Sequence, residues 1–431
     1  MGLNRRILLA GAGAGALAAP LLGKGTAAHA APGKNKKVTT GAQAQADAGW
    51  AALKNTKLGI ITNPTGVLDD LTSIVDNMHA AGLNIVGVFG PEHGFRGTAQ
   101  AGEAEETYVD ERTGITVYDA YGANTDKMVK MFTDSGVETV VFDIQDVGAR
   151  FYTYIWTMYT AMKAAAQLNK KFVVLDRPNP TGGTAYGPMM TEAYTSGVGA
   201  EAITQQHGMS VGELARFLNG EIIASDTGGR RVNDLKVIEM SGWDPASRYD
   251  ATGLDWVMPS PNMPTPDTAV LYPGTGMFEG TNLSEGRGTT RPFEVIGAPY
   301  VDHKWNERLT KLNLPGVKFR EMYFTPTFNK YVGEVCGGVQ VHVVDPAAVN
   351  PIRVATEMLV ALKALYPKFA WRQDSWDTAR PFWIDKLTGS TRFRELIDAG
   401  KSANEVEVAH RRELREFDVR RQRYLLYKGK R

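Results

Sequence analysis

The sequence predicts an α/β protein in which a parallel sheet, covered by helices on both faces, is followed by a second, smaller α/β domain. Three observations support this prediction. Short apolar runs alternate with segments of helical period through the first half of the chain. The length of 431 residues exceeds what one hydrophobic core usually serves. A proline-rich stretch then separates this pattern from a region of different character.

The first half contains the elements of a parallel sheet in regular alternation. Apolar runs that end in turn signals predict strands at 57–62, 84–89, 116–119, 138–143 and 171–175. Apolar residues at helical spacing predict helices at 71–81, 126–135 and 151–168. The strands are short and nearly continuous in apolar residues, as expected of a sheet that is buried on both faces.

The second half opens with a proline-rich stretch, Val257 to Pro273. Its prolines are expected to exclude a helix and to form a rigid crossing between domains. The boundary is therefore placed near residue 266, which gives domains at 50–266 and 267–431. Beyond the boundary the sequence predicts a strand at 339–344, a helix at 351–366 and a long charged helix, or a pair of helices, at 403–427.

The first thirty residues have the features of an export signal. Arg5 and Arg6 precede the apolar run 7–22, and the small residues of Ala28-His29-Ala30 follow. The paired arginines favour the twin-arginine route, so residues 1–30 are predicted to be a cleaved signal and 31–49 a polar leader. The protein is then expected in the periplasm, at the cell wall or outside the cell. No later segment is long and apolar enough to cross a bilayer.

The charge and cysteine content exclude several classes of protein. The formal net charge is +1, and removal of residues 1–30 makes the chain slightly acidic, which argues against a general nucleic-acid binder. Cys336 is the single cysteine. It cannot form an internal disulfide, a cysteine-cluster zinc site or a cysteine-ligated iron–sulfur centre.

Charged loops follow three of the predicted strands. They read P-E-H-G-F-R-G (91–97), I-Q-D-V-G-A-R (144–150) and D-R-P-N (176–179). Ligands of open parallel sheets bind beyond the carboxyl ends of the strands, so these loops are the expected site. An acid in a poorly solvated position there favours its protonated form and suits a general acid, which makes Glu92 a candidate. Alternatively, Asp143, Asp146 and Arg150 could simply pair with one another.

A second motif, G-M-S-V-G at 208–212, matches the nucleophile elbow of serine hydrolases. The lead-in to Ser210 is polar, whereas an elbow requires a buried strand. Glu213 and the apolar residues after it favour a capping box at the start of a helix. The cap is the preferred interpretation, and His207 beside Ser210 keeps a serine esterase open as the alternative.

Metal and nucleotide sites receive little support. His93, Asp143, Asp146 and Asp176 include metal-ligating types but lack any recognised metal spacing. The glycine-rich segment 274–280 lacks the Lys-Ser/Thr pair of a phosphate loop. The sequence therefore predicts neither a metal nor a cofactor.

Five segments in order resemble the NamZ-type exo-β-N-acetylmuramidases. They are G-I-I-T-N-P-T-G (59–66), F-G-P-E-H-G-F-R-G (89–97), F-D-I-Q-D-V-G-A-R-F-Y-T-Y (142–154), D-R-P-N-P (176–180) and P-G-T-G-M-F-E-G-T-N-L-S-E-G-R-G-T-T-R-P-F (273–293). The resemblance runs from about residue 55 to the C-terminus. It implies a Rossmann-like domain, a smaller second domain and a cleft between them. It also implies release of N-acetylmuramic acid from the non-reducing ends of peptidoglycan fragments.

The resemblance assigns catalysis to Glu92. Glycoside hydrolysis usually requires a second carboxylate, for which Asp143, Asp146, Glu279 and Glu285 are candidates, unless the acetamido group of the substrate is the nucleophile. Muramic acid carries a lactyl carboxylate, which an arginine binds well. Arg150, Arg177, Arg287 and Arg291 are the candidates, and the last two are preferred. Further expected contacts to substrate come from His93, Arg96, Gln145, Asn179, Asn262 and Asn282.

Three hypotheses follow. The first is an exported exo-muramidase that acts on peptidoglycan glycans. The second is an exported serine esterase that uses Ser210. The third is a wall-binding protein without catalytic activity on the same scaffold.

Overall fold

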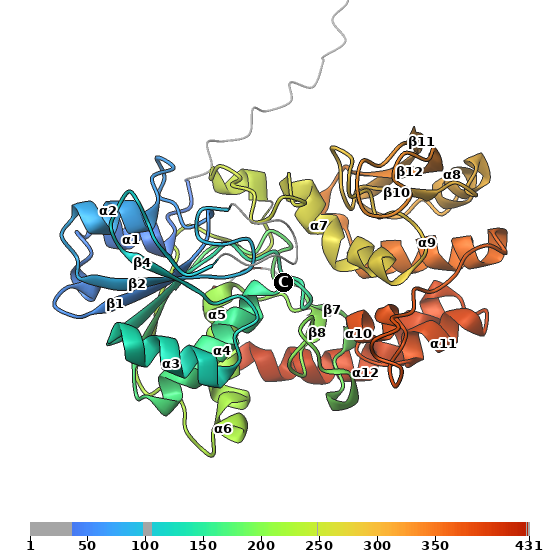
Figure 1. Ribbon diagram of the computed structural model, residues 1–431. Helices are drawn as coiled ribbons and strands as arrows, with labels where there is room; N and C mark the ends of the chain where they lie inside the picture. The colour runs from blue at the N-terminus through green and yellow to red at the C-terminus, as the bar shows by residue number, and fades with distance from the viewer. Residues whose placement is uncertain (1–36, 98–105, 248, 428, 430–431) are drawn as a thin grey trace, which may run out of the picture. The chain divides into compact units, whose positions relative to one another are not determined.

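A seven-stranded sheet forms the core of the first half of the chain (Figure 1). The structure is a computed structural model that describes residues 37–97, 106–247, 249–427 and 429. The strand order is β3-β4-β2-β1-β5-β6-β9. The strands are β1 Leu58–Thr62, β2 Ile85–Gly90, β3 Tyr108–Val109, β4 Thr116–Asp119, β5 Thr139–Asp143, β6 Lys171–Leu175 and β9 Leu235–Ile238.

All neighbouring strands are parallel except the β3–β4 pair at one edge. The parallel strands taken in chain order have the Rossmann arrangement 3-2-1-4-5-6. In this arrangement the chain reverses direction across the sheet between β1 and β5. The predicted α/β class, with a parallel Rossmann-like sheet, is confirmed.

Helices cover both faces of the sheet, because apolar side chains alternate along its strands. Ile61, Phe142 and Val174 point to one face, where α3 (Thr125–Ser135), α4 (Tyr154–Gln167) and α5 (Val211–Glu221) pack. Ile60, Val141 and Val173 point to the other, where α1 (Gly41–Asp47), η1 (Ala51–Leu53) and α2 (Ile74–Ala80) pack. Figure 1 shows the two helical layers on opposite sides of the strands. Apolar residues on both strand faces are the physical reason that the strands could be recognised from sequence.

Between β6 and β9 the chain leaves the sheet. It forms a two-stranded hairpin, β7 Tyr186–Met189 and β8 Thr204–Gln206, with the short helix η2 (Glu192–Tyr194) inside it. It then returns through α5 and α6 (Ile223–Asp226), and η3 (Tyr249–Thr252) follows β9. Neither this hairpin nor β9 is predicted from the sequence, because the apolar segments of these strands are short and partly polar.

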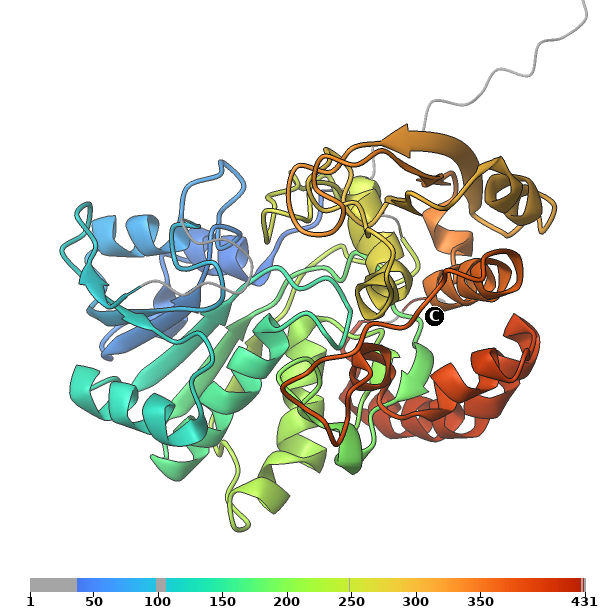
Figure 2. The same cartoon turned by 45° about the vertical axis from the view of Figure 1, so that its right-hand side comes forward.

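A three-stranded antiparallel sheet with order β10-β12-β11 is the core of the second half. Its strands are β10 Val295–Ala298, β11 Val317–Phe324 and β12 Cys336–Val343. Figure 2 shows them beside α8 (His303–Thr310) and α9 (Pro351–Leu365). The remaining elements are η5 Pro346–Ala348, α10 Trp383–Thr388, α11 Arg392–Asp398, α12 Ala403–Arg421 and η6 Gln422–Tyr424.

The prediction that the proline-rich stretch contains no helix is wrong for its last residues. They form α7, Pro266–Thr275, which continues into η4, Gly276–Gly280. Thr265 caps the helix through its side chain, and Pro266 stands at its first turn, where no backbone donor is needed. Pro273 lies near the C-terminal end of α7, where it cannot donate the backbone hydrogen bond to the carbonyl four residues earlier.

Residues Lys36–Arg431 form one compact unit. The division at residue 266 therefore stays a prediction, as does the cleft. The predicted signal and most of the polar leader lie outside the described residues. None of the described helices combines the length and the apolar content that a bilayer crossing requires.

Candidate active site

The loops that follow β1, β5 and β6 are tied to one another at the carboxyl edge of the sheet. The Thr62 hydroxyl donates to the Asp143 carbonyl at 2.8 Å. The backbone N–H of Gln145 donates to Thr65 Oγ1, and its side chain donates to the Pro178 carbonyl. This edge lies at the reversal point of strand order, where Rossmann-like sheets bind their ligands.

Glu92 lies in the loop that follows β2 and is half-buried. The Thr153 hydroxyl donates to Glu92 Oε2 at 2.6 Å. Burial raises the pKa of the Tyr121 hydroxyl. The charge of Glu92, and a hydrogen bond between the Tyr121 and Glu92 side chains, raise this pKa further. His93, the next residue, has a positive φ of 70° and is buried. The hydroxyl groups of Thr153 and Tyr121 thus both interact with the Glu92 carboxyl group.

The Tyr272 ring lies against Phe151 and Tyr152 of the first half of the chain and against Phe293 of the second. It is buried on α7, and burial raises its pKa well above the ordinary value. The charge of Glu279 raises the pKa further and that of Glu92 adds to it, whereas the charge of Arg287 opposes the rise. The charge of Glu285 also raises this pKa, so the charges of three glutamates act on the Tyr272 hydroxyl.

Glu279 belongs to a group of alternating charges. Arg287 Nη2 lies 2.7 Å from Glu279 Oε1, and its Nε lies 3.3 Å from Glu285 Oε1. Lys330 Nζ lies 2.9 Å from Glu285 Oε2. The Arg287 guanidinium also stacks over the Phe293 ring at 5.0 Å. Glu285 is almost completely buried, whereas about a fifth of the Glu279 and Arg287 side chains is exposed.

Asp143 and Arg177 form a buried ion pair. The guanidinium binds the carboxylate through two nitrogens, with Nη2 at 2.8 Å from Oδ2, and its Nη2 also donates to the Val67 carbonyl. Burial raises the pKa of Asp143, and the charge of Arg177 opposes this rise. Since both groups satisfy each other, neither presents a free charge to a ligand in this conformation.

Asp146 pairs with His207. The distance from His207 Nε2 to Asp146 Oδ2 is 3.0 Å, and the Gly148 N–H donates to the same oxygen. Asp146 Oδ1 is buried and has no hydrogen-bond partner among the described residues. The described part of the chain also contains no group of three or more His, Cys, Asp or Glu side chains placed to hold a metal ion.

Arg150 occupies a structural position. Its side chain is completely buried and donates to the carbonyls of Pro188, Ile203 and Leu387. These contacts join the loop after β5 to the β7–β8 hairpin and to α10. The guanidinium is therefore enclosed by main chain and cannot reach a lactyl carboxylate in this conformation. Asp143, Asp146 and Arg150 do not pair with one another.

Most of the other predicted contact residues also have partners within the protein. Arg96 binds Asp76 and Asp110, and Arg291 approaches Glu294 at 3.5 Å. The amides of Gln145, Asn179 and Asn282 all hydrogen-bond to backbone groups of neighbouring loops. Asn262 is buried in the proline-rich stretch.

Ser210 caps α5, as the preferred interpretation of its motif predicts. Its hydroxyl accepts from the Glu213 N–H in a capping box and donates to Asp176 Oδ2 at 2.7 Å. His207 is paired with Asp146 instead of Ser210. Burial raises the pKa of Asp176 to about 7, although hydrogen bonds from Tyr427 and Ser210 lower it. A buried serine bonded to an aspartate is not an esterase nucleophile, so the esterase hypothesis is not supported.

Three residues whose hydroxyl groups bond to Glu92 or respond to its charge were not predicted from the sequence. Tyr121 follows β4, Thr153 precedes α4 and Tyr272 lies on α7. The first could have been found, because it also follows a strand at the carboxyl edge. Tyr272 could not, because the prolines around it obscured the helix that positions it.

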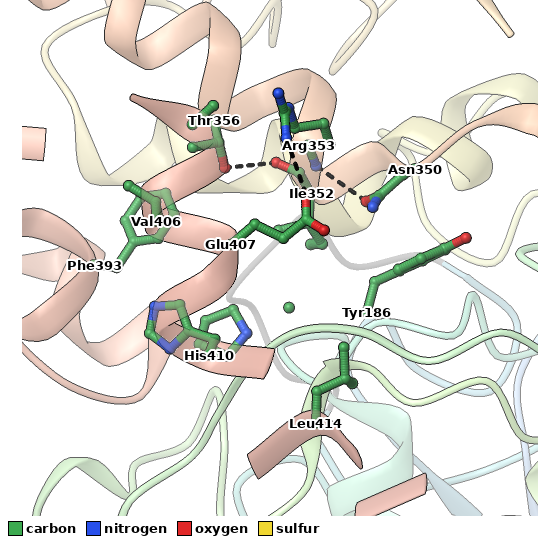
Figure 3. Close-up of a pocket in the computed structure, with 13 residues that line it drawn as sticks. Tyr186, Asn350, Ile352, Arg353, Thr356, Phe393, Val406, Glu407, His410 and Leu414 are labelled. Atoms are coloured by element: carbon green, nitrogen blue, oxygen red, sulfur yellow. Dashed lines mark hydrogen bonds and ion pairs between the residues drawn. The ribbon is translucent and has the colours of Figure 1, made fainter. Parts of the chain in front are cut away.

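Two hollows lie outside this group of residues. One, of about 440 Å³, borders the Glu92 loop and includes Asn63, Phe95, Arg96 and Arg112 in its lining. The other, of about 120 Å³, is lined by β7, α9, α11 and α12 (Figure 3). Its walls include Ile352, Phe393, Val406 and His410, and none of the predicted site residues lines it.

The fold is that of a Rossmann-like α/β protein, and its candidate site holds carboxyl groups beside hydroxyl groups and an arginine, the types of group that glycoside hydrolases use. Comparison with known proteins gives the family. The N-terminal model of the exo-β-N-acetylmuramidase NamZ family matches residues 58–267 and its C-terminal model matches 270–427. The chain belongs to this family.

Individual relatives agree with this assignment. The peptidoglycan β-N-acetylmuramidase NamZ of Bacillus subtilis (strain 168) is 41% identical over 416 residues, which cover 94% of this chain and 97% of that protein. Two crystal structures of DUF1343 family proteins from Bacteroides fragilis NCTC 9343 are similar. They are 34% and 30% identical, with TM-scores of 0.80 and 0.73, and each comparison covers 92% of this chain and 100% of the other.

Proposed function

We propose that this protein is an exported exo-β-N-acetylmuramidase that releases N-acetylmuramic acid from the non-reducing ends of peptidoglycan fragments. Family membership supports the reaction. The observation that carries the proposal is the position of Glu92. It is a half-buried carboxyl group at the carboxyl edge of the parallel sheet, bonded to Thr153 and facing Tyr121.

In this proposal Glu92 is the general acid that protonates the glycosidic oxygen as the bond to the muramic acid breaks. The Thr153 hydroxyl donates to Oε2 and so fixes the orientation of the carboxyl group. In this step the proton passes from the Glu92 carboxyl group to the leaving glycosidic oxygen.

Glu279 is proposed as the second carboxylate. Of the four candidates, Asp143 and Glu285 are buried in ion pairs and Asp146 is buried against His207. Glu279 retains about a fifth of its side-chain surface exposed, beside Arg287. In a two-carboxylate mechanism it activates water or attacks the sugar. In a substrate-assisted mechanism it orients the acetamido group.

Arg287 is proposed to bind the lactyl carboxylate. Arg150 and Arg177 are enclosed by internal partners, whereas Arg287 is partly exposed and adjoins Glu279. Arg291, at the outer end of the same segment, can assist. We expect Arg287→Ala to lower the kcat/KM for muramides relative to glucosaminides by about tenfold to a hundredfold, the value of a charge-assisted bidentate contact.

The measurement is the ratio of the two kcat/KM values, with Arg412→Ala as the control because Arg412 is 87% exposed on α12. Arg287→Lys keeps the charge but not the bidentate geometry, so it should recover only part of the preference. An unchanged ratio in Arg287→Ala and in Arg291→Ala would remove both residues from this role.

The export part of the proposal rests on residues 1–30. The paired arginines, the apolar run and the Ala-His-Ala site support a cleaved twin-arginine signal. Peptidoglycan lies outside the cytoplasm, so the proposed substrate and the proposed location agree. Fractionation of cells that express the full chain, with Arg5 and Arg6 replaced by lysine as the comparison, tests the route.

A chromogenic N-acetyl-β-muramide tests the reaction itself. The wild type should hydrolyse it, Glu92→Gln should lose about 10²–10⁴-fold in rate, the usual contribution of a general acid, and Ser210→Ala should remain active. Loss of activity in Ser210→Ala alone would favour the esterase. A folded wild type without any activity would favour a wall-binding protein.

A further inference from the structure

The segment between α9 and α10 carries an exposed tryptophan and is attached to η4. Trp376 lies in this segment and is 70% exposed. Burial of a large aromatic side chain is favourable. An exposed tryptophan that is held in place therefore indicates a contact surface. Contacts at both ends of the segment, and a lysine beneath the indole ring, hold Trp376 in place.

The first end of the segment is attached beside Glu279. Trp371 forms a β-bridge with Thr281, and the Arg372 N–H donates to the Gly280 carbonyl at 2.9 Å. Gly280 is also packed against α10, since a Cβ on it would meet Ile384 at 2.8 Å. The segment and α10 are thus built directly onto η4, the element that carries Glu279.

The other end is attached to the first half of the chain. Arg380 donates to the carbonyls of Ala193 and Thr195 in the segment between β7 and β8. A β-bridge between Gln373 and Phe382 closes the segment into a hairpin-like loop. With both ends fixed, the tip that carries Trp376 loses little conformational freedom when a ligand binds.

A buried lysine orients the indole ring. Lys386 Nζ lies 4.0 Å from the centre of the Trp376 ring, and the lysine side chain is completely buried. Asp374 and Asp377 hold the ammonium group at 3.3 Å and 3.1 Å. The cation therefore occupies one face of the ring and leaves the opposite face to solvent.

We propose that the free face of Trp376 is a stacking platform for a sugar ring on the leaving-group side of the scissile bond. This inference rests on the proposed function. An exo-enzyme holds the terminal sugar at Glu92, so the rest of the glycan must leave the site across the surrounding surface. The C–H face of a pyranose is apolar and flat, and a fixed indole ring in a segment attached to η4 matches it.

The test uses substrates that differ only on the leaving-group side. They are methyl N-acetyl-β-muramide, which has no sugar there, and soluble glycan chains with a non-reducing muramic acid and two, four or six sugars. For Trp376→Ala the ratio of kcat/KM for the longest glycan to that for the methyl glycoside should fall about tenfold, the loss expected for one buried aromatic contact. Trp376→Phe, which keeps a flat ring, should recover part of the ratio.

Tyr323→Ala is the matched control, because Tyr323 is also an exposed aromatic residue (58%) but lies on β11. It should leave the ratio as in the wild type. Circular dichroism and the Tm of each variant establish that it is folded. An unchanged ratio in folded Trp376→Ala would overturn the platform.

The platform and the proposed function can fail separately. If the wild type hydrolyses none of the muramides, the proposed function fails. Calorimetric titration of the six-sugar glycan then still tests the platform. Weaker binding by Trp376→Ala than by the wild type supports it, and equal binding or no binding to either protein contradicts it.

Discussion

At the scale of single residues, Asp143 and Arg177 form a buried ion pair whose charges neutralise each other and serve the fold. Its two side chains are 0% and 7% exposed and bind each other through two nitrogen–oxygen contacts. They lie at the ends of neighbouring strands, β5 and β6, so the parallel register brings them together. The pair fixes the ends of β5 and β6, whereas Glu92, in the loop after β2, stays half-buried.

Replacement of Arg177 by methionine should destabilise the fold strongly. The change leaves the Asp143 carboxylate buried without its partner, and the free energy of unfolding should fall by about 3–5 kcal/mol. Urea unfolding, followed by circular dichroism, measures this change. The double variant with Asp143→Leu should recover part of the loss, because no unpaired charge remains. A single variant that unfolds at the wild-type urea concentration would contradict this account.

The sequence located the charged loops but not the pairs within them. Parallel strands end at one edge, so residues that follow them must converge, and this reasoning found Glu92, Asp143, Asp146 and Arg177. Which of these charges neutralise each other depends on side-chain direction and strand neighbours. Arg150 shows the consequence, since its sequence suggested a ligand contact but its donors serve main-chain carbonyls.

At the scale of elements, the geometry at the start of α5 shows that Ser210 is a helix cap and not a nucleophile. Ser210 and Glu213 form a reciprocal capping box, and the serine hydroxyl also donates to the buried Asp176. The apolar residues of α5 pack on the sheet, so the cap fixes the point at which the helix leaves the loop. The serine is part of the fold at this position.

Ser210→Ala should therefore lower stability and leave the chemistry intact. Loss of the cap and of the bond to Asp176 should cost about 1–2 kcal/mol. The Tm should fall, while kcat on a muramide, measured well below the Tm, should equal that of the wild type. Ser210→Thr, which can retain the cap, should recover much of the stability. A folded Ser210→Ala protein without activity would refute the structural role.

Element prediction succeeded where local signals agreed and failed where they conflicted. Strands β1, β2, β4, β5 and β6 were located to within one or two residues because their apolar runs end in glycine, proline or polar turns. Helix α7 was missed because prolines were taken to exclude a helix. Packing of its residues against the cores of both halves stabilises it despite Pro273.

At the scale of the whole molecule, the end of the chain returns to the first sheet. The Tyr427 hydroxyl donates to Asp176 Oδ2 at 2.6 Å and accepts from the Met240 N–H. The backbone N–H groups of Leu426 and Tyr427 donate to Glu213. The C-terminal residues thus complete the surroundings of β6, β9 and α5 and make the first half dependent on the last residues of the chain.

Deletion of residues 425–431 should lower the Tm of the protein as a whole. It removes the partners of Asp176, Glu213 and Met240 together, so the loss should exceed the roughly 1–2 kcal/mol of the single hydroxyl removed in Tyr427→Phe. Scanning calorimetry compares the two variants with the wild type. A Tm that is unchanged by the deletion would show that the tail is dispensable.

The domain boundary and the export signal remain predictions at this scale. The two family models meet near residue 270, close to the proposed boundary, while backbone and side-chain contacts join the halves at Arg150, Arg380 and Arg421. Fold class could be predicted from apolar periodicity alone. The contacts between the halves could not, because they join residues more than 180 positions apart.

The most direct measurement is the product released from glycan chains of known ends. Chains with a non-reducing muramic acid are incubated with the wild type, Glu92→Gln and the matched control Glu111→Gln, whose glutamate is exposed on the surface. Mass spectrometry then identifies the products. The account predicts free N-acetylmuramic acid as the first product of the wild type and the control, and almost none from Glu92→Gln. Internal fragments as first products, or full release by Glu92→Gln, would contradict it.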